Sequence, residues 1–248
     1  MTIKFKTLVA LALTTGAALL YSACTKETKV VNPVNNDKAI ATSIAINLYK
    51  SIGNTIASQN DKTGLPASTG VRNGIKVNDL TCGELIEVPY NNIYTKGDSV
   101  KDVMVGSNKY VVSCNGNQPN GYTYSGTYKN TGFSPYATYD NSVDEYYTLK
   151  ALLPGFAKMQ VDGNQVSVYK VTTKKDGEYM EQHNSYTLSG LIIDASNRPF
   201  DITAGTASFT STGNNAGRAF TFKGTIEFLG SHKAKVSFDG KTFDITIE

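Results

Sequence analysis

The sequence predicts a mainly β protein, an antiparallel meander that forms a curved sheet or a barrel-like structure, with one N-terminal amphipathic helix packed on it. From about residue 84 onward, short runs alternate apolar and polar side chains, the period-two pattern of strands with one buried face. Before that point, residues 38–59 repeat apolar side chains every four residues, which is the spacing of a helix. The chain has 248 residues, 40% of them hydrophobic and 18% charged, so it is long and apolar enough for a folded core.

Residues 1–23 predict a signal peptide. Lys4 and Lys6 precede an apolar run over residues 8–20, and the small residues Ser22 and Ala23 follow it. A positive start, a short apolar stretch and a small-residue exit are typical of secretory signals. A helix of this length rises about 20 Å, less than the roughly 30 Å of a bilayer's hydrocarbon core. We therefore expect the segment to be removed rather than to span a membrane.

Residues 20–24, Leu-Tyr-Ser-Ala-Cys, resemble the lipobox of bacterial lipoproteins, although Tyr21 departs from the aliphatic residue usual there. The alternative is ordinary signal cleavage after Ala23. The resemblance implies that Cys24 becomes the first residue, carries palmitate and other acyl chains, and anchors the protein in the outer membrane. Residues 24–37 lack apolar periodicity and predict a flexible tether. Whether the protein faces the cell surface or the periplasm stays undecided.

Residues 38–248 predict a single β-rich domain that starts with the helix at 38–59. Asn36 or Asp37 provides the cap of this helix. The apolar stripe consists of Ile40, Ile44, Leu48, Ile52 and Ile56.

Strands fill the rest of the domain. Asp162-Gly163 and Asp239-Gly240 both predict tight type I′ hairpin turns. Strands are expected at residues 86–94, 109–114, 121–129, 146–152, 156–161, 165–173, 186–193, 206–211, 219–228, 233–238 and 243–248.

Cys82 and Cys114 remain as an even pair once Cys24 is lipidated. An exported chain meets an oxidising compartment, so the pair predicts a structural disulfide. Closing a loop of about 33 residues stabilises the fold by roughly 3.5–4 kcal/mol in the chain-entropy model. The alternative is two free buried thiols.

Recognisable catalytic chemistry is missing from the sequence. It contains no nucleophile elbow, phosphate-binding loop or zinc-binding HExxH motif, and neither His183 nor His232 has metal-ligand spacing. We expect no enzyme activity, no catalytic residue, no metal and no cofactor. Loss of Lys4 and Lys6 lowers the net charge from +3 to +1, and the chain has only three arginines, so no nucleic-acid partner is expected.

Tyrosines concentrate in the middle of the chain, where eight of the 15 fall between residues 110 and 147. One interpretation is an aromatic platform for sugar rings or a protein partner. The other is a tyrosine-lined sheet that packs on its own core, which the polar residues at intervening positions and the absence of Trp favour. The candidate ligand-binding residues are Tyr122, Tyr124, Tyr128, Tyr136 and Tyr139.

Two further resemblances concern the cell envelope. Asp98-Ser99-Val100 resembles the short O-glycosylation signal of exported Bacteroidota proteins, which implies glycosylation at Ser99. The lipobox, the helix with Ala-Ile-Asn-Leu-Tyr-Lys-Ser-Ile at 45–52, Cys82-Gly83 and the β-rich remainder together resemble uncharacterised Bacteroidota outer-membrane lipoproteins. This resemblance implies an envelope location and no particular activity.

The sequence therefore predicts a lipid-anchored envelope protein that binds a glycan or another ligand without catalysis. One alternative is a periplasm-facing structural or interaction protein with an envelope protein as partner. The other is a lipocalin-like carrier of a small ligand.

Overall fold

The computed structural model describes residues 37–53, 81–153, 156–196, 200–215 and 217–247. The predicted signal peptide, Cys24 and the tether up to residue 36 lie outside these residues, as do positions 54–59 of the predicted helix. The elements are α2 (Asp37–Ile52), β1 (Leu85–Lys96), β2 (Val100–Asn115), β3 (Gln118–Phe133), β4 (Ala137–Ala151), β5 (Lys158–Thr173), β6 (Tyr179–Asp194), β7 (Asp201–Asn215), β8 (Arg218–Gly230), β9 (Lys233–Phe238) and β10 (Lys241–Thr246).

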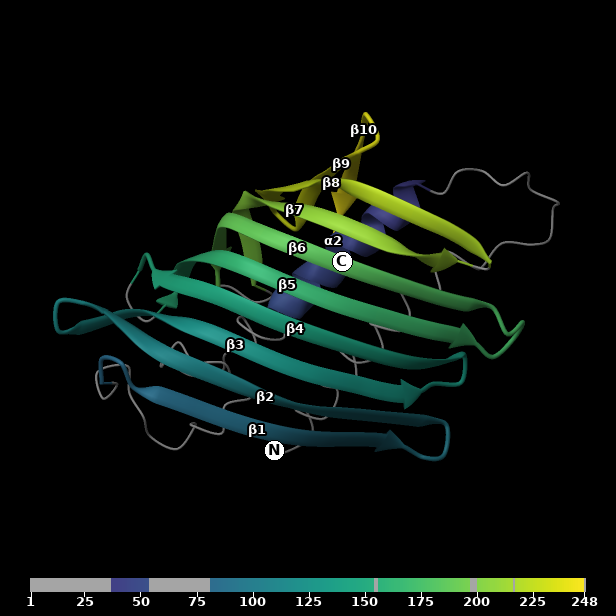
Figure 1. Ribbon diagram of the computed structural model, residues 1–248, viewed down its shortest axis with the longest axis horizontal. Helices are drawn as coiled ribbons and strands as arrows, with labels where there is room; N and C mark the ends of the chain where they lie inside the picture. The colour runs from purple at the N-terminus through teal and green to yellow at the C-terminus, as the bar shows by residue number, and fades with distance from the viewer. Residues whose placement is uncertain (1–36, 54–80, 154–155, 197–199, 216, 248) are drawn as a thin grey trace, which may run out of the picture.

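The described strands form one antiparallel sheet in which spatial order follows chain order. Every strand from β1 to β10 pairs with the next, and the connections are short. Figure 1 shows the strands ascending from β1 at the bottom to β9 and β10 at the top, with α2 across one face. The predicted antiparallel meander is confirmed. Within the described residues β1 pairs only with β2, and β10 only with β9, so the sheet is open rather than a closed barrel.

The two faces of the sheet differ sharply in burial. In β4 the side chains of Val143, Glu145, Tyr147 and Leu149 are buried, whereas the residues between them are exposed. Successive side chains of a strand point to opposite faces, so this alternation separates two surfaces. We call the face that carries these four side chains the inner face, and the opposite one the outer face.

Helix α2 contacts the inner face along its length. The side chains of Ile44, Leu48 and Ile52 have no exposed surface. The hydroxyl of Tyr186 in β6 donates a 3.0 Å hydrogen bond to the carbonyl oxygen of Ile44. Lys241 Nζ of β10 lies 2.6 Å from an Asp37 carboxylate oxygen at the start of the helix. The helix stripe and the inner-face side chains thus form one core.

One predicted turn is absent. Asp239-Gly240 does connect β9 and β10, with φ angles of 51° and 71° that suit a type I′ turn. Asp162-Gly163, by contrast, lies inside the continuous strand β5, where the register shifts between Val161 and Gly163. The hairpin expected there is wrong, because the extra residue is absorbed as a β-bulge. The Asp162 carboxylate accepts a 2.6 Å hydrogen bond from the amide of Gly190, at a second register shift in β6.

Candidate functional site

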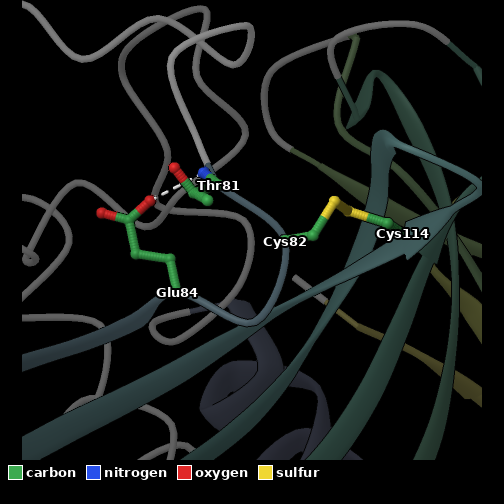
Figure 2. Close-up of a disulfide and its surroundings, with 4 residues drawn as sticks. All are labelled: Thr81, Cys82, Glu84 and Cys114. Carbon is green, nitrogen blue, oxygen red and sulfur yellow. Dashed lines mark hydrogen bonds between the residues drawn. A yellow bond between two sulfur atoms is a disulfide. The ribbon is translucent and has the colours of Figure 1, made fainter.

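The disulfide joins Cys82, just before β1, to Cys114 near the end of β2, with a Cα–Cα distance of 5.8 Å. The predicted pairing is confirmed. Figure 2 shows the bond near Thr81, whose amide donates a 2.8 Å hydrogen bond to a carboxylate oxygen of Glu84. Because β1 pairs only with β2 among the described strands, the covalent link fixes the start of an edge strand to the rest of the sheet.

Three of the five tyrosines expected to form a ligand platform lie on the inner face. Tyr122 and Tyr124 are 2% and 1% exposed. The Tyr124 ring stacks on Tyr147 with centroids 5.8 Å apart. The Tyr128 hydroxyl lies 3.3 Å from Ser51 Oγ of α2. An exposed platform is therefore wrong for these three residues, because the face that they share is turned toward the helix and the core.

The fourth, Tyr139, lies on the same inner face near the start of β4, and the fifth, Tyr136, lies outside the strands. The hydroxyl of Tyr139 donates a 2.6 Å hydrogen bond to Asp102 Oδ1. Burial, and then this contact with the carboxylate, raises the pKa of Tyr139 above its usual range. Tyr136 lies between β3 and β4 and is 56% exposed. The five candidates therefore do not share one surface.

Ser99, the predicted glycosylation residue, is exposed in the turn between β1 and β2. Its hydroxyl donates a 3.2 Å hydrogen bond to the carbonyl oxygen of Lys96. Its modification remains a prediction.

A buried carboxylate occupies the centre of the inner face. Glu145 is 4% exposed. It accepts hydrogen bonds from Ser51 of the helix, from the Tyr124 hydroxyl at 3.2 Å and from the Tyr147 hydroxyl at 3.3 Å. Burial, and then the negative charge of Glu145, raises the pKa of Tyr147 well above its usual value. The hydroxyl therefore stays a hydrogen-bond donor, and the cluster holds the helix to β3 and β4.

A second polar chain crosses the inner face nearer the C-terminal strands. Ser43 of the helix donates to Gln182 Oε1 at 3.3 Å, and Gln182 Nε2 donates to Ser211 at 3.0 Å. Ser211 in turn donates to Asn184 Oδ1 at 2.8 Å. Gln182, Asn184 and Ser211 are 2%, 1% and 0% exposed. These groups satisfy one another under the helix, so they fix its position rather than receive a ligand from solvent.

His232 takes part in the same attachment of the helix. Its Nδ1 lies 2.8 Å from the hydroxyl oxygen of Tyr49, which donates a 2.8 Å hydrogen bond to the carbonyl oxygen of Phe200. The Asp201 carboxylate accepts the backbone amides of Ser231 and His232 at 2.6 and 3.1 Å. Burial, and then the charge of Asp201, raises the pKa of Tyr49 above its usual range. The group thus links α2 to the turn between β8 and β9.

His183 lies on the outer face, in strand β6, and contacts Glu181 of the same strand. Its Nε2 is 2.8 Å from Glu181 Oε1, which also lies 3.4 Å from Lys170 Nζ. The Tyr179 hydroxyl and His183 lower the pKa of Glu181. Among the described residues, no three His, Cys, Asp or Glu side chains are grouped so that they bind a metal ion.

Two of the hollows on the described surface are open to solvent and lined by charged side chains. The first, of about 680 Å³, lies at one end of the sheet, and its carboxylates bond to neighbours: Asp176 accepts from Thr173, and Glu181 from Tyr179. The second, of about 420 Å³, lies on the outer face around Tyr146. Its outward-facing lining residues are Glu87, Ser107, Lys109, Ser125, Thr127, Asp144, Tyr146, Asn164 and Val166.

Comparison with known proteins gives no relative: no family model, curated protein or solved structure matches the chain. In the part of the chain that the structure describes, no helix has both the length and the apolar content needed to cross a bilayer. The candidate site is therefore judged on its own geometry. Both hollows contain an exposed tyrosine, Tyr179 in the first and Tyr146 in the second. The outer-face hollow differs in that its outward polar groups come from five adjacent strands, β1 to β5.

Proposed function

We propose that the protein is a lipid-anchored, non-catalytic binding module of the cell envelope, and that the outer face of its sheet is the binding surface. The observation that carries the proposal is that one face of the sheet is covered and the other is exposed. The inner face is occupied by α2 and by the protein's own aromatic and polar side chains. The outer face presents exposed side chains from all the strands and contains the hollow around Tyr146.

The absence of catalysis is part of the proposal. Within the described residues, His183 and His232 lie on different faces, and each contacts a carboxylate and other groups of its own neighbourhood. Glu145, the most buried of the described acidic side chains, accepts hydrogen bonds from Ser51, Tyr124 and Tyr147 beneath the helix. General acid–base or nucleophilic chemistry needs such groups within reach of one substrate.

The place where the helix starts suits a flexible anchor. Asp37 forms an ion pair with Lys241 in the last hairpin, so the start of the domain lies beside β10. Thirteen residues from Cys24 to Asn36 extend at most about 45 Å. A tether of this reach lets the outer face turn away from the membrane to meet a ligand.

The experiment combines anchoring and exposure in cells that make the protein. Cells are labelled with a fatty-acid analogue, and the wild type is compared with Cys24→Ser. We expect label and membrane retention in the wild type and neither in the variant. Label that persists in Cys24→Ser overturns the anchor. Protease is then added to intact and lysed cells, and the β8–β10 region is probed. Degradation in intact cells supports a surface binding module, and protection until lysis supports the second candidate.

The second candidate is a periplasm-facing interaction protein whose partner adds to the edge of the sheet. The observation in its favour is β1, which in the described part of the chain pairs on one side only and in which Leu85 and Ile93 are 54% and 64% exposed. Unpaired edge strands are templates for added strands. Pro89 in the middle of β1 removes one backbone donor, which weakens this edge. If the protein is protected from protease until the cells are lysed, a crosslinker placed at position 93 is expected to capture such a partner. A lipocalin-like carrier holds its ligand inside a closed barrel. The described sheet is open and its inner face is filled by the protein's own side chains, so this third candidate has no comparable support.

A further inference from the structure

The hollow around Tyr146 combines one apolar spot with a polar surround. The Tyr146 side chain is 55% exposed, and Val166 on the neighbouring strand is 50% exposed. Tyr146 pairs with Asn164, two residues before Val166, so the two apolar side chains are diagonal neighbours on one face. The area is small and isolated among polar residues, which suits the apolar C–H face of a sugar ring stacked on a tyrosine.

Hydrogen-bonding groups extend from this spot in a row across the sheet. The residues directly opposite one another from β1 to β6 are Glu87, Lys109, Ser125, Tyr146, Asn164 and Thr187. Neighbouring strands lie about 4.8 Å apart, so the row spans about 24 Å. Such a row offers donors and acceptors to several linked sugar units rather than to one.

One member of the row is already oriented. The Thr187 hydroxyl donates a 3.0 Å hydrogen bond to Asn164 Oδ1. That bond holds the amide in place and leaves Nδ2 as a donor beside the Tyr146 ring. Asp144, opposite Thr127 and Val166, adds a carboxylate acceptor on the other side. Planar amide and carboxylate groups next to an aromatic ring match vicinal hydroxyls of a stacked sugar.

The charges of the hollow select among glycans. Glu87 and Asp144 are negative, and Lys109, directly opposite Glu87, is the one cation among the lining residues. The net charge of the outward-facing lining residues is therefore −1, and the inward-facing Glu145, which also borders the hollow, adds a further negative charge. A polyanionic glycan meets repulsion here, whereas a neutral chain does not.

We propose that the outer-face hollow around Tyr146 binds a neutral glycan chain, with the ring stacked on a sugar and Asn164 and Asp144 bonded to its hydroxyls. The inference rests on the proposed function, because it makes the outer face the binding surface. A protein partner is less well matched, since stable protein interfaces bury about 800 Å² per partner around an apolar centre, and the apolar spot here consists of Tyr146 and Val166.

The test uses the full chain, purified in detergent, and a panel of neutral polysaccharides with polyuronates for comparison. Binding is measured by calorimetry for the wild type, Tyr146→Ala, Tyr146→Phe and Asn164→Ala. We expect Tyr146→Ala to weaken binding about tenfold or more, Asn164→Ala to weaken it about fivefold, and Tyr146→Phe to keep it within about twofold. Polyuronates are expected not to bind.

Tyr136→Ala is the matched control, because Tyr136 is 56% exposed and Tyr146 is 55% exposed. Unchanged binding in this variant and loss in Tyr146→Ala support the proposal. Loss in Tyr136→Ala with retention in Tyr146→Ala overturns it and moves the site to the turn between β3 and β4. Tight binding of polyuronates overturns the neutral class.

Failure of the inference is distinguishable from failure of the proposed function. If the wild type binds none of the neutral glycans, the glycan site is overturned. The anchored module stands in that case as long as Cys24→Ser loses its lipid and intact cells lose the domain to protease. A protein that crosslinks through position 146, in place of glycan binding, likewise overturns the glycan site and keeps the outer face as the binding surface.

Discussion

The inner and outer faces of β4 present the same kinds of residue with opposite consequences. Tyr147 and Glu145 point inward, are 0% and 4% exposed, and hydrogen-bond to each other. Tyr146 and Asp144, one position away, point outward and line a hollow that is open to solvent. Residue type alone therefore does not distinguish the groups of the core from those of the proposed binding surface. The face of the sheet makes this distinction, because period-two alternation decides whether a tyrosine is buried in the core or exposed to solvent.

The largest expected loss of stability comes from a substitution in the helix that packs on the inner face. Leu48→Ala removes a side chain with no exposed surface, which costs about 3 kcal/mol of unfolding free energy through lost burial and a cavity. Leu229→Ala, at an outer position that is 46% exposed, is expected to change it by less than about 0.5 kcal/mol. Urea unfolding of both variants measures the two values. Equal losses would mean that α2 contributes nothing to the core.

A smaller effect is expected at the buried carboxylate. Glu145→Ala removes the buried carboxylate that accepts hydrogen bonds from Ser51, Tyr124 and Tyr147, which costs about 2 kcal/mol. The two tyrosine hydroxyls keep one acceptor each, Asn108 and Gln165, which limits the loss. The control is Asp144→Ala on the outer face, where we expect less than about 0.5 kcal/mol. Denaturant unfolding compares the two. A stability of Glu145→Ala equal to that of the wild type would show that the cluster does not hold the helix.

Alkaline pH is expected to destabilise the fold by a smaller amount, through the ionisation of buried tyrosines. Burial, and then the charge of Glu145, raises the pKa of Tyr90 from 10.0 to about 12, and burial raises that of Tyr147 well above 10.0. The unfolded chain therefore releases these protons first. Stability is fully present below pH 10.0 and falls as the pH rises toward 12, by at most about 1.4 kcal/mol per pH unit for each such tyrosine.

Unfolding experiments from neutral to about pH 12, together with phenolate absorbance, follow this loss. Tyr147→Phe is expected to reduce the slope. A slope that is the same in Tyr147→Phe and the wild type would contradict the role of the buried tyrosine.

The sequence predicts the class of fold because strands with an apolar inner row show a clear alternation of apolar and polar residues. Ile226 and Phe228 alternate with exposed residues as expected, and the cysteines pair as expected. The strands of the middle region extend further than predicted, because their inner rows contain polar residues. Asn108 in β2 and Glu145 in β4 are buried, yet they interrupt the apolar pattern that marks a strand. No local signal distinguishes a buried glutamate from a solvated one.

The two Asp-Gly pairs also show that local sequence alone does not decide the structure. Both dipeptides permit the positive φ angles of a tight turn. At Asp239-Gly240 the flanking segments pair with each other, and a hairpin forms. At Asp162-Gly163 the flanking segments both pair with β4 and β6, so the strand continues through a bulge. Pairing partners far along the chain decide the outcome, and so they also decide which tyrosines face solvent. The hollow around Tyr146 is invisible until the register is known.

Chemical footprinting of the tyrosines probes both faces of the sheet in one experiment. The native full chain is iodinated with and without a neutral polysaccharide, and modified tyrosines are quantified by mass spectrometry. We expect modification of Tyr136 and Tyr146, protection of Tyr124 and Tyr147, and loss of Tyr146 modification alone when the glycan is added. Modification of Tyr124 and Tyr147 in the folded protein, or a glycan that leaves Tyr146 reactive, would contradict this prediction.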